Sequence, residues 1–288
     1  MTISSFKPGM HANGSSSEAL AAGQDPLEGQ FEVIRDLLYS IAGIRLTEAK
    51  RDLVRARLTR RLRKLGGGSV TGYVEFVQTP QGRSELTEMV DILTTNKTSF
   101  FREANHFDFL QRVLSERPAS AGPPTIWSAG CSSGEEPYTL AMVLSHHGRL
   151  RRGSAGRILA TDISDRVLAH AREGVYDREQ VEPVPEDMRK VYLRKAKDPD
   201  QVEVSPALKE MIRFGRLNLM GDWPMSGPFD AIFCRNVMIY FDNPTRETLA
   251  QRFTELLTPG GYLFVGHSES LTSLKHGLRY VQPAVYRR

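Results

Sequence analysis

Residues 125–138 follow a pattern that few folds use. The segment Thr-Ile-Trp-Ser-Ala-Gly-Cys-Ser-Ser-Gly-Glu-Glu-Pro-Tyr starts as a short apolar strand, passes through small residues and then begins a helix. A strand, a loop and a helix in this order form the ligand cradle of nucleotide-binding α/β folds. A pyrophosphate bound at the helix start would meet the carboxylates of Glu135 and Glu136. The pattern therefore favours a cationic ligand over a phosphate, and S-adenosylmethionine is such a ligand.

The C-terminal part of the chain alternates between apolar strands and amphipathic helices. This alternation predicts a doubly wound, Rossmann-like α/β domain with a mainly parallel sheet over residues 125–288. The stretch 195–210 is predicted to be a small β insertion. We predict strands at 125–129, 157–161, 229–234, 261–266 and 279–287, and helices at 136–148, 164–173 and 246–257.

A small all-α domain is predicted at 27–114, from helical spacing of apolar residues at 28–42, 47–65, 71–78 and 83–94. Three prolines make 115–124 the expected linker.

Residues 1–26, rich in Gly, Ser and Ala, are expected to form a disordered tail. They contain no apolar run for a signal peptide or a membrane span. We therefore expect a cytoplasmic protein without direct membrane insertion.

Cysteine and histidine usage bears on redox state and metal binding. Cys131 and Cys234 are the only cysteines and lie far apart, which favours reduced thiols. The seven histidines show no ligand spacing for zinc or iron, so no metal cofactor is expected.

The second predicted helix concentrates positive charge, although the whole chain carries a formal net charge of only +4. A solvated helix face is the ordinary explanation. The helix has eight cationic side chains and only two acidic ones, Glu48 and Asp52, which is more positive charge than solubility requires. This excess predicts a docking surface for an acidic partner. A nucleic-acid backbone would satisfy the same electrostatics. The cations are Lys50, Arg51, Arg55, Arg57, Arg60, Arg61, Arg63 and Lys64.

Five segments together carry a resemblance to a known family. They are Thr-Thr-Asn-Lys-Thr-Ser-Phe-Phe-Arg-Glu-Ala-Asn-His-Phe (94–107), the cradle at 125–138, Ala-Thr-Asp-Ile-Ser-Asp (160–165), Cys-Arg-Asn-Val-Met-Ile-Tyr-Phe-Asp (234–242) and Pro-Gly-Gly-Tyr-Leu-Phe-Val-Gly-His-Ser-Glu (259–269). In this order they resemble the bacterial chemotaxis receptor methyltransferases. The resemblance extends from about Phe31 to the C-terminus.

The resemblance implies methyl transfer from S-adenosylmethionine to glutamate side chains of membrane chemoreceptors. The products would be glutamyl methyl esters and S-adenosylhomocysteine. It also implies a set of cofactor-binding residues, with Asn218 and Leu219 at the adenine and Arg235 and Asn236 at the methionine part. The full set is Asn96, Thr98, Arg102, Glu136, Asp162, Asn218, Leu219, Arg235 and Asn236.

Several of these residues have a plain structural alternative. Asp162 ends a predicted strand, where a carboxylate can accept both ribose hydroxyls or can cap the next helix. Arg235 and Asn236 could belong to a solvated loop. His267, beside a glycine, is interpreted as a structural group.

A glutamate acceptor is already ionised at neutral pH and needs no general base. The site must instead align the carboxylate with the methyl group and exclude water. The resemblance assigns this catalytic role to Arg102 and Tyr240. Arg102 could alternatively pair with an acid, and Tyr240 could pack under the sheet, a place that we expect Phe241 to take.

The resemblance implies that the basic helix meets the acidic methylation region of the receptors, through Arg51, Arg55, Arg57, Arg60, Arg61 and Arg63. One branch of the family also binds a receptor C-terminal peptide through a glycine-containing insertion. The matching stretch 194–202 has no glycine, so we expect direct docking through the helical domain. We also expect the protein to be a monomer. A nucleic-acid methyltransferase and a non-catalytic, cofactor-sensing adaptor are the alternatives. Base-modifying enzymes generally carry Asp/Asn-Pro-Pro-aromatic where this chain has Cys234-Arg235-Asn236-Val237.

Overall fold

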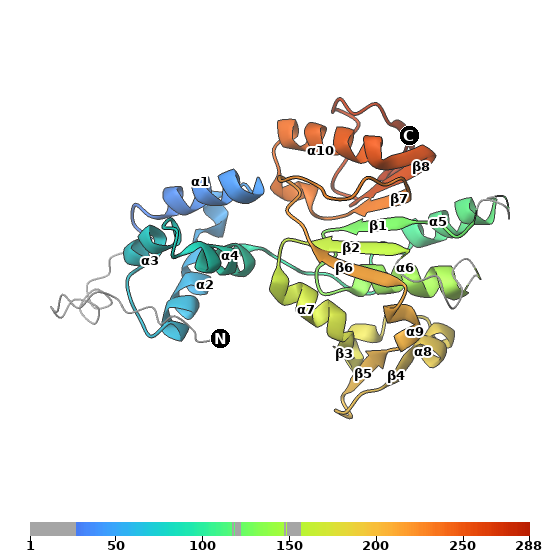
Figure 1. The fold of residues 1–288 in the computed structure, drawn as a ribbon, viewed down its shortest axis with the longest axis horizontal. Coiled ribbons are helices and arrows are strands. Elements are labelled where there is room, and N and C mark those ends of the chain that lie inside the picture. Colours follow the sequence, from blue (N-terminus) through green and yellow to red (C-terminus); the bar gives the residue numbers. More distant parts are fainter. Residues whose placement is uncertain (1–26, 117, 119–121, 147, 149–156) are drawn as a thin grey trace. The chain divides into compact units, whose positions relative to one another are not determined.

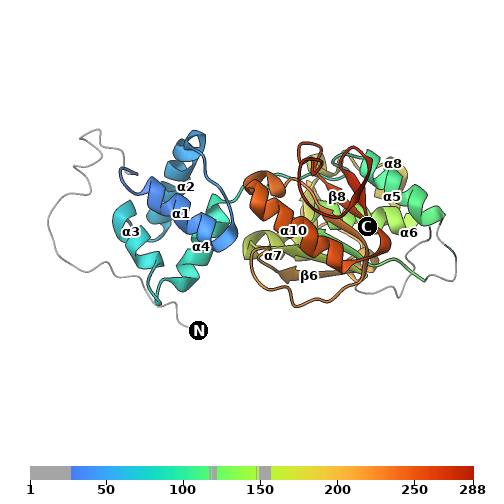
Figure 2. The same ribbon diagram turned by 90° about the horizontal axis from the view of Figure 1, so that it is seen from above.

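The computed structural model describes residues 27–116, 118, 122–146, 148 and 157–288. The chain divides into two compact units, Met1–Thr95 and Asn96–Arg288, and each is described by itself (Figures 1 and 2). The tail predicted at 1–26 lies outside the described residues.

The first unit is helical, as the spacing of its apolar residues predicts. Its core is formed by side chains that recur every three or four residues, including Ile34, Leu38, Val54, Leu58 and Tyr73. Gly43 adopts a left-handed conformation at φ 67° and ends the first helix. The elements are α1 (Phe31–Ala42), η1 (Glu48–Lys50), α2 (Arg51–Lys64), α3 (Val70–Val77) and α4 (Arg83–Leu93).

The second unit is built on a seven-stranded sheet with the order β6-β2-β1-β7-β8-β10-β9 (Figure 1). The first five of these strands are parallel, and β10 and β9 continue the sheet in antiparallel pairing. The mainly parallel α/β sheet is thereby confirmed. The strands are β1 (Ile126–Ala129), β2 (Ile158–Asp162), β6 (Ile212–Arg216), β7 (Phe229–Cys234), β8 (Leu257–Val265), β9 (Arg279–Gln282) and β10 (Val285–Arg287).

Helices cover both faces of this sheet (Figure 2). Alternate strand residues point to opposite faces, so Ile126 and Phe233 belong to one core and Trp127 and Ile232 to the other. The first core includes side chains of α5 (Asn105–Ser115), α6 (Glu135–His146) and α7 (Asp165–Glu173). The second core is closed by α10 (Asn243–Leu256).

The boundary between the units differs from the predicted one. The chain divides after Thr95. Residues 96–114 were predicted as part of the helical domain, but they belong to the second unit, and most of helix α5 lies within them. Its buried Phe107 stacks on Phe233 of β7, with ring centroids 6.0 Å apart and planes 9° apart. Burial of α5 against the sheet therefore places the division before the helix and not in the proline-rich stretch 115–124.

The insertion is larger than predicted. A separate sheet with the order β3-β5-β4 consists of β3 (Val175–Asp177), β4 (Leu193–Lys195) and β5 (Gln201–Val204), so it begins about twenty residues before 195–210. Short helices complete this region: η3 (Arg178–Val181), α8 (Glu186–Tyr192) and α9 (Pro206–Lys209). Within the described residues, no helix combines the length and the apolar character needed to cross a membrane.

Candidate functional site

Loops at the carboxyl ends of β1, β2, β7 and β8 lie next to the segment 96–103. Parallel strands bring these ends to one edge of the sheet, where ligands of such folds bind. Ser132, after β1, donates its hydroxyl to the Asn96 carbonyl at 2.9 Å and its N–H to Asp162 Oδ2 at 2.8 Å. Arg235, after β7, donates to the Arg102 carbonyl. Residues that the sequence analysis selected on separate segments are therefore brought together.

Asp162 organises the loops around the end of β2. Its second oxygen, Oδ1, accepts from the Ser164 N–H at 3.0 Å. The cap of α7 is Ser164, whose hydroxyl accepts from the Val167 N–H, so Asp162 is not the helix cap. A carboxylate has about four acceptor positions and can accept from several donors at once.

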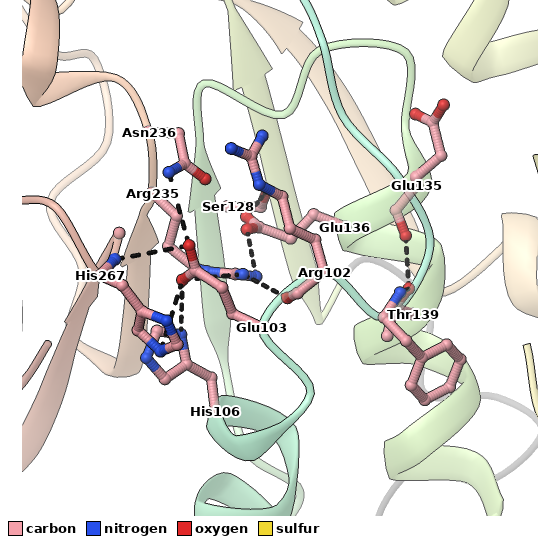
Figure 3. A network of polar contacts seen from close by, with 12 residues as sticks. Arg102, Glu103, His106, Ser128, Glu135, Glu136, Thr139, Arg235, Asn236 and His267 are labelled. Atoms are coloured by element: carbon pink, nitrogen blue, oxygen red, sulfur yellow. Dashed lines mark hydrogen bonds and ion pairs between the residues drawn. The ribbon is translucent and has the colours of Figure 1, made fainter. Parts of the chain in front are cut away.

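Arg235 is the centre of a buried ion network (Figure 3). Its side chain is only 2% exposed, and it lies between Glu136 Oε2 at 3.1 Å and Glu103 Oε2 at 3.2 Å. Ser128, on β1, also donates its hydroxyl to Glu136 at 2.7 Å. The Arg235 guanidinium thus has structural ion pairs, and its loop is not simply solvated.

The carboxylates in this network respond differently to their surroundings. Burial raises the pKa of Glu136, although Arg235 opposes that effect. Burial would also raise the pKa of Glu103, but Arg235 and the His267 N–H act more strongly together and lower it. Glu103 and Glu136 place two carboxyl groups around the buried guanidinium of Arg235, which suits a cofactor that carries positive charge.

Several buried polar atoms have no hydrogen-bond partner among the described residues. Three that belong to sequence-selected or neighbouring side chains are Asn96 Nδ2, Glu103 Oε2 and Arg235 Nε. A buried polar group without a partner costs about 1–3 kcal/mol, so such atoms suit a site that completes its bonds on binding a ligand.

Left-handed backbone conformations concentrate at the same place. Phe101, Glu103, Ser132 and Asn236 have φ values of 52°, 57°, 49° and 58°. Each is a non-glycine residue in a conformation that costs on the order of 1–3 kcal/mol and is found mainly where a site requires it. The pair at 101 and 103 encloses Arg102, so the backbone around this arginine is held in a specific shape.

Arg102 and Tyr240 remain predicted catalytic residues. Arg102 is partly buried and donates to the Lys97 carbonyl at 2.9 Å, and its guanidinium points away from Glu103 (Figure 3). It has no ion pair with a described acid. Tyr240 ends η4 (Met238–Tyr240) and is partly buried, whereas Phe241 packs against the second core, as expected.

The loop after β6 holds the residues predicted for the adenine. Asn218 is partly buried and accepts from the Met220 N–H through its side-chain oxygen at 3.0 Å. Leu219 is buried in the second core, and Arg252 of α10 donates to its carbonyl at 2.8 Å. Thr98 is partly buried in the segment 96–103, near Asn96 in the chain.

Glu269 was not among the predicted site residues, yet it joins two loops of the site. Its side chain is buried, with the residue 1% exposed. Oε2 accepts from the N–H groups of Gly266 and Asn236, both at 2.6 Å, and Oε1 accepts from Ile239 at 3.0 Å. Glu269 lies in the segment 259–269 that carries the resemblance, but its partners across the sheet edge cannot be read from the sequence.

We expect Glu269→Gln to destabilise the protein. One carboxylate oxygen becomes an NH₂ group that faces an N–H donor, so at least one charged hydrogen bond is lost, worth about 1.5–3 kcal/mol. Urea unfolding measures this change, with Glu255→Gln on the exposed part of α10 as control. Equal unfolding midpoints for the two variants would contradict the assigned role.

Two family models match the chain. The "CheR methyltransferase, SAM binding domain" model matches residues 96–286, and the "CheR methyltransferase, all-alpha domain" model matches residues 29–94. The two matched ranges agree with the division of the structure after Thr95.

Curated relatives agree with these models. A chemotaxis protein methyltransferase of Borreliella burgdorferi is 42% identical over 88% of this chain and 91% of its own length. A probable chemotaxis protein methyltransferase of Rhizobium etli is 42% identical over 87% of this chain and 96% of its own length. The chemotaxis protein methyltransferase of Escherichia coli is 39% identical over 90% of this chain and 90% of its own length. A solved S-adenosylmethionine-dependent methyltransferase from Mesorhizobium loti is 18% identical over 54% of this chain and 50% of its own, with a TM-score of 0.29, too low to add to the assignment. The chain therefore belongs to the CheR methyltransferase family and is an S-adenosylmethionine-dependent methyltransferase.

Proposed function

We propose that this enzyme methylates glutamate side chains in the cytoplasmic methylation region of membrane chemoreceptors. The products are glutamyl methyl esters and S-adenosylhomocysteine. The observation that carries the proposal is Arg102, a partly buried guanidinium beside the acidic cofactor network and without an ion pair to a described acid. Such a group is available to bind an incoming carboxylate. The enzyme acts in the cytoplasm, as a monomer.

The proposed cofactor site uses residues from four loops. Asp162 accepts from the ribose hydroxyls, Asn218 and Leu219 contact the adenine, and Glu136 attracts the cationic part of the cofactor. Asn96, Thr98, Arg102, Arg235 and Asn236 complete the binding set. The bound cofactor supplies a methyl group on a sulfonium. The unpartnered Nδ2 of Asn96 supports its place in this set.

The chain's own residues supply alignment. In the proposed mechanism Arg102 binds the acceptor carboxylate, and the Tyr240 hydroxyl donates to it and fixes the direction of attack. No general base is needed, because a glutamate with a pKa near about 4.3 is ionised at neutral pH. Water must be excluded, since a hydrated carboxylate is a weaker nucleophile.

The basic helix α2 uses its arginines in two ways. Arg61 forms a bidentate pair with Glu85, at 2.7 and 2.6 Å, and Arg57 donates to the carbonyls of Ile92 and Thr94. These two side chains therefore hold α2 against α4. Arg51 pairs locally with Glu48 at 2.9 Å.

The remaining predicted docking arginines border a hollow on the other side of α2. Its lining is Asp52, Arg55, Ala56, Thr59, Arg60 and Arg63. Arg60 and Arg63 are exposed. We place the acidic receptor helix on this basic face, defined by Arg55, Arg60 and Arg63. The absence of glycine at 194–202 supports direct docking here over tethering by a receptor peptide.

Replacing Arg55, Arg60 and Arg63 with glutamate should raise the apparent KM for receptor and leave cofactor affinity unchanged. Exposed charges act over about 8–10 Å at physiological salt, so added salt should also weaken methylation by the wild type. Receptor titrations at matched salt measure both effects. The control variant Arg83→Glu reverses an exposed charge at the start of α4. An unchanged KM for receptor in the triple variant would contradict docking on the basic face. If the triple variant instead lost binding to RNA, the nucleic-acid alternative would be favoured.

Methyl transfer itself is tested with purified receptor fragments. S-adenosylhomocysteine should form with a fragment that keeps its methylatable glutamates and stop when they are replaced by alanine. Equal product formation with the replaced fragment, or formation only with RNA, would overturn the proposed acceptor.

A further inference from the structure

Glu103, His106 and His267 form a cluster, and the proposed methyl transfer uses neither of its histidines. Glu103 Oε2 lies 3.5 Å from His106 Nδ1 and 4.0 Å from His267 Nε2, and all three atoms lie within 4.8 Å of one another (Figure 3). We propose that this cluster is a binding site for Zn²⁺ or a similar nitrogen-preferring divalent cation, and that its occupation opposes binding of the cationic cofactor.

The side chains at this site are prepared as ligands. His106 is fully buried, and neither of its ring nitrogens has a hydrogen-bond partner among the described residues. Full burial favours the neutral imidazole, the form that binds metals. Glu103 Oε2 accepts no hydrogen bond, although it is ion-paired with Arg235 at 3.2 Å. A buried imidazole with two unsatisfied nitrogens is costly, and a metal bond satisfies one of them.

The spacing is close to that of a tetrahedral site. Zinc bonds of about 2.0–2.2 Å to nitrogen and oxygen place neighbouring ligand atoms about 3.3–3.5 Å apart. The distance from Glu103 Oε2 to His106 Nδ1 already equals the upper value. A rotation of the His267 side chain can shorten the 4.0 Å distance from its Nε2 to Glu103 Oε2. His267 is 49% exposed, so it can move, and a cation can enter on its side. Water can take the fourth position.

The donor set selects the metal. Two imidazoles and one carboxylate suit Zn²⁺, Co²⁺ or Ni²⁺, whereas Mg²⁺ and Ca²⁺ prefer all-oxygen sites. Arg235 limits the affinity, because its Nη2 lies 3.2 Å from the same Glu103 oxygen. A bound cation must therefore compete with the guanidinium for Glu103.

Competition for Glu103 links the metal to the cofactor, and this link rests on the proposed cofactor site. A cation at Glu103 adds positive charge and removes one of the two acidic partners of Arg235. S-adenosylmethionine carries a sulfonium that S-adenosylhomocysteine lacks, so zinc should weaken binding of the former more. By linkage, S-adenosylmethionine must weaken zinc binding by the same factor.

Calorimetric titration of the full chain with Zn²⁺ tests the site directly. We expect binding of one zinc at this site, an affinity at least about tenfold lower in His267→Ala, and unchanged affinity in His276→Ala, a partly buried histidine outside the cluster. Mg²⁺ and Ca²⁺ should not compete. Equal zinc affinity in the wild type and His267→Ala would overturn the proposal.

Two further measurements separate folding and cofactor effects. Visible absorption of bound Co²⁺ should show a low-coordinate nitrogen and oxygen site that is lost in His267→Ala, while circular dichroism shows whether that variant folds. Titration with S-adenosylmethionine and S-adenosylhomocysteine, with and without Zn²⁺, tests the link. Zinc binding without any effect on the cofactor would refute the link and the proposed place of the cofactor, but not the metal site.

Discussion

Replacing Tyr240 with phenylalanine should lower kcat by about 10- to 1,000-fold and leave the affinity for S-adenosylhomocysteine unchanged. The variant loses only a hydroxyl, at the end of η4, and the partly buried ring can stay in place. A hydroxyl that orients the acceptor carboxylate contributes mainly in the transition state, so its loss affects turnover more than ground-state binding. Single-turnover methylation of receptor together with calorimetry of S-adenosylhomocysteine separates the two quantities.

The matched control is Tyr280→Phe. Tyr280 lies on β9, the edge strand of the sheet, and is 53% exposed. It should methylate receptor as the wild type does. If Tyr240→Phe also retained wild-type turnover, Tyr240 would be a packing residue and the alignment of the acceptor would depend on Arg102 alone.

Asp162→Ala should weaken S-adenosylhomocysteine binding by about 10- to 100-fold, equivalent to about 1.4–2.7 kcal/mol. The change removes the carboxylate proposed to bind the ribose. It also removes the acceptor of the Ser132 and Ser164 N–H groups, which positions the loop after β1. Hydrogen bonds to a charged group contribute about 1.5–3 kcal/mol each, so the two losses support an effect of this size.

Asp165→Ala controls for a general effect of charge, because Asp165 lies three residues further on in α7 and is mostly exposed. It should bind S-adenosylhomocysteine normally. Nicotinamide adenine dinucleotide should not compete, since its pyrophosphate would meet Glu136. Tight binding of the dinucleotide, or normal S-adenosylhomocysteine affinity in Asp162→Ala, would contradict the cofactor site.

Most of the fold could be predicted because its signals are local. The predicted strand at 229–234 matches β7, and that at 125–129 differs by one residue from β1. Helix α5 was missed although Phe107, Leu110 and Leu114 have helical spacing. Its assignment depends on packing against Phe233 and Phe264, which come more than a hundred residues later. Local patterns do not contain such contacts.

The candidate site shows the same limit. Asp162 and Glu136 could be selected because strand ends and helix starts are visible in the sequence. The bond from Ser132 to Asp162 and the pairing of Arg235 with Glu103 and Glu136 could not, because they join separate loops. His267 was interpreted as a structural group, and only the structure places it beside Glu103 and His106. The chemistry of the residue types was readable, but their mutual distances were not.

The stability of the transferred methyl group in base tests the central claim most directly. The protein is incubated with methyl-labelled S-adenosylmethionine and a receptor fragment, and the labelled fragment is then treated with mild base. Glutamyl methyl esters hydrolyse readily, so we expect the label to be released as methanol. Label that stays on the fragment after this treatment would show methylation of nitrogen and contradict carboxylate methylation.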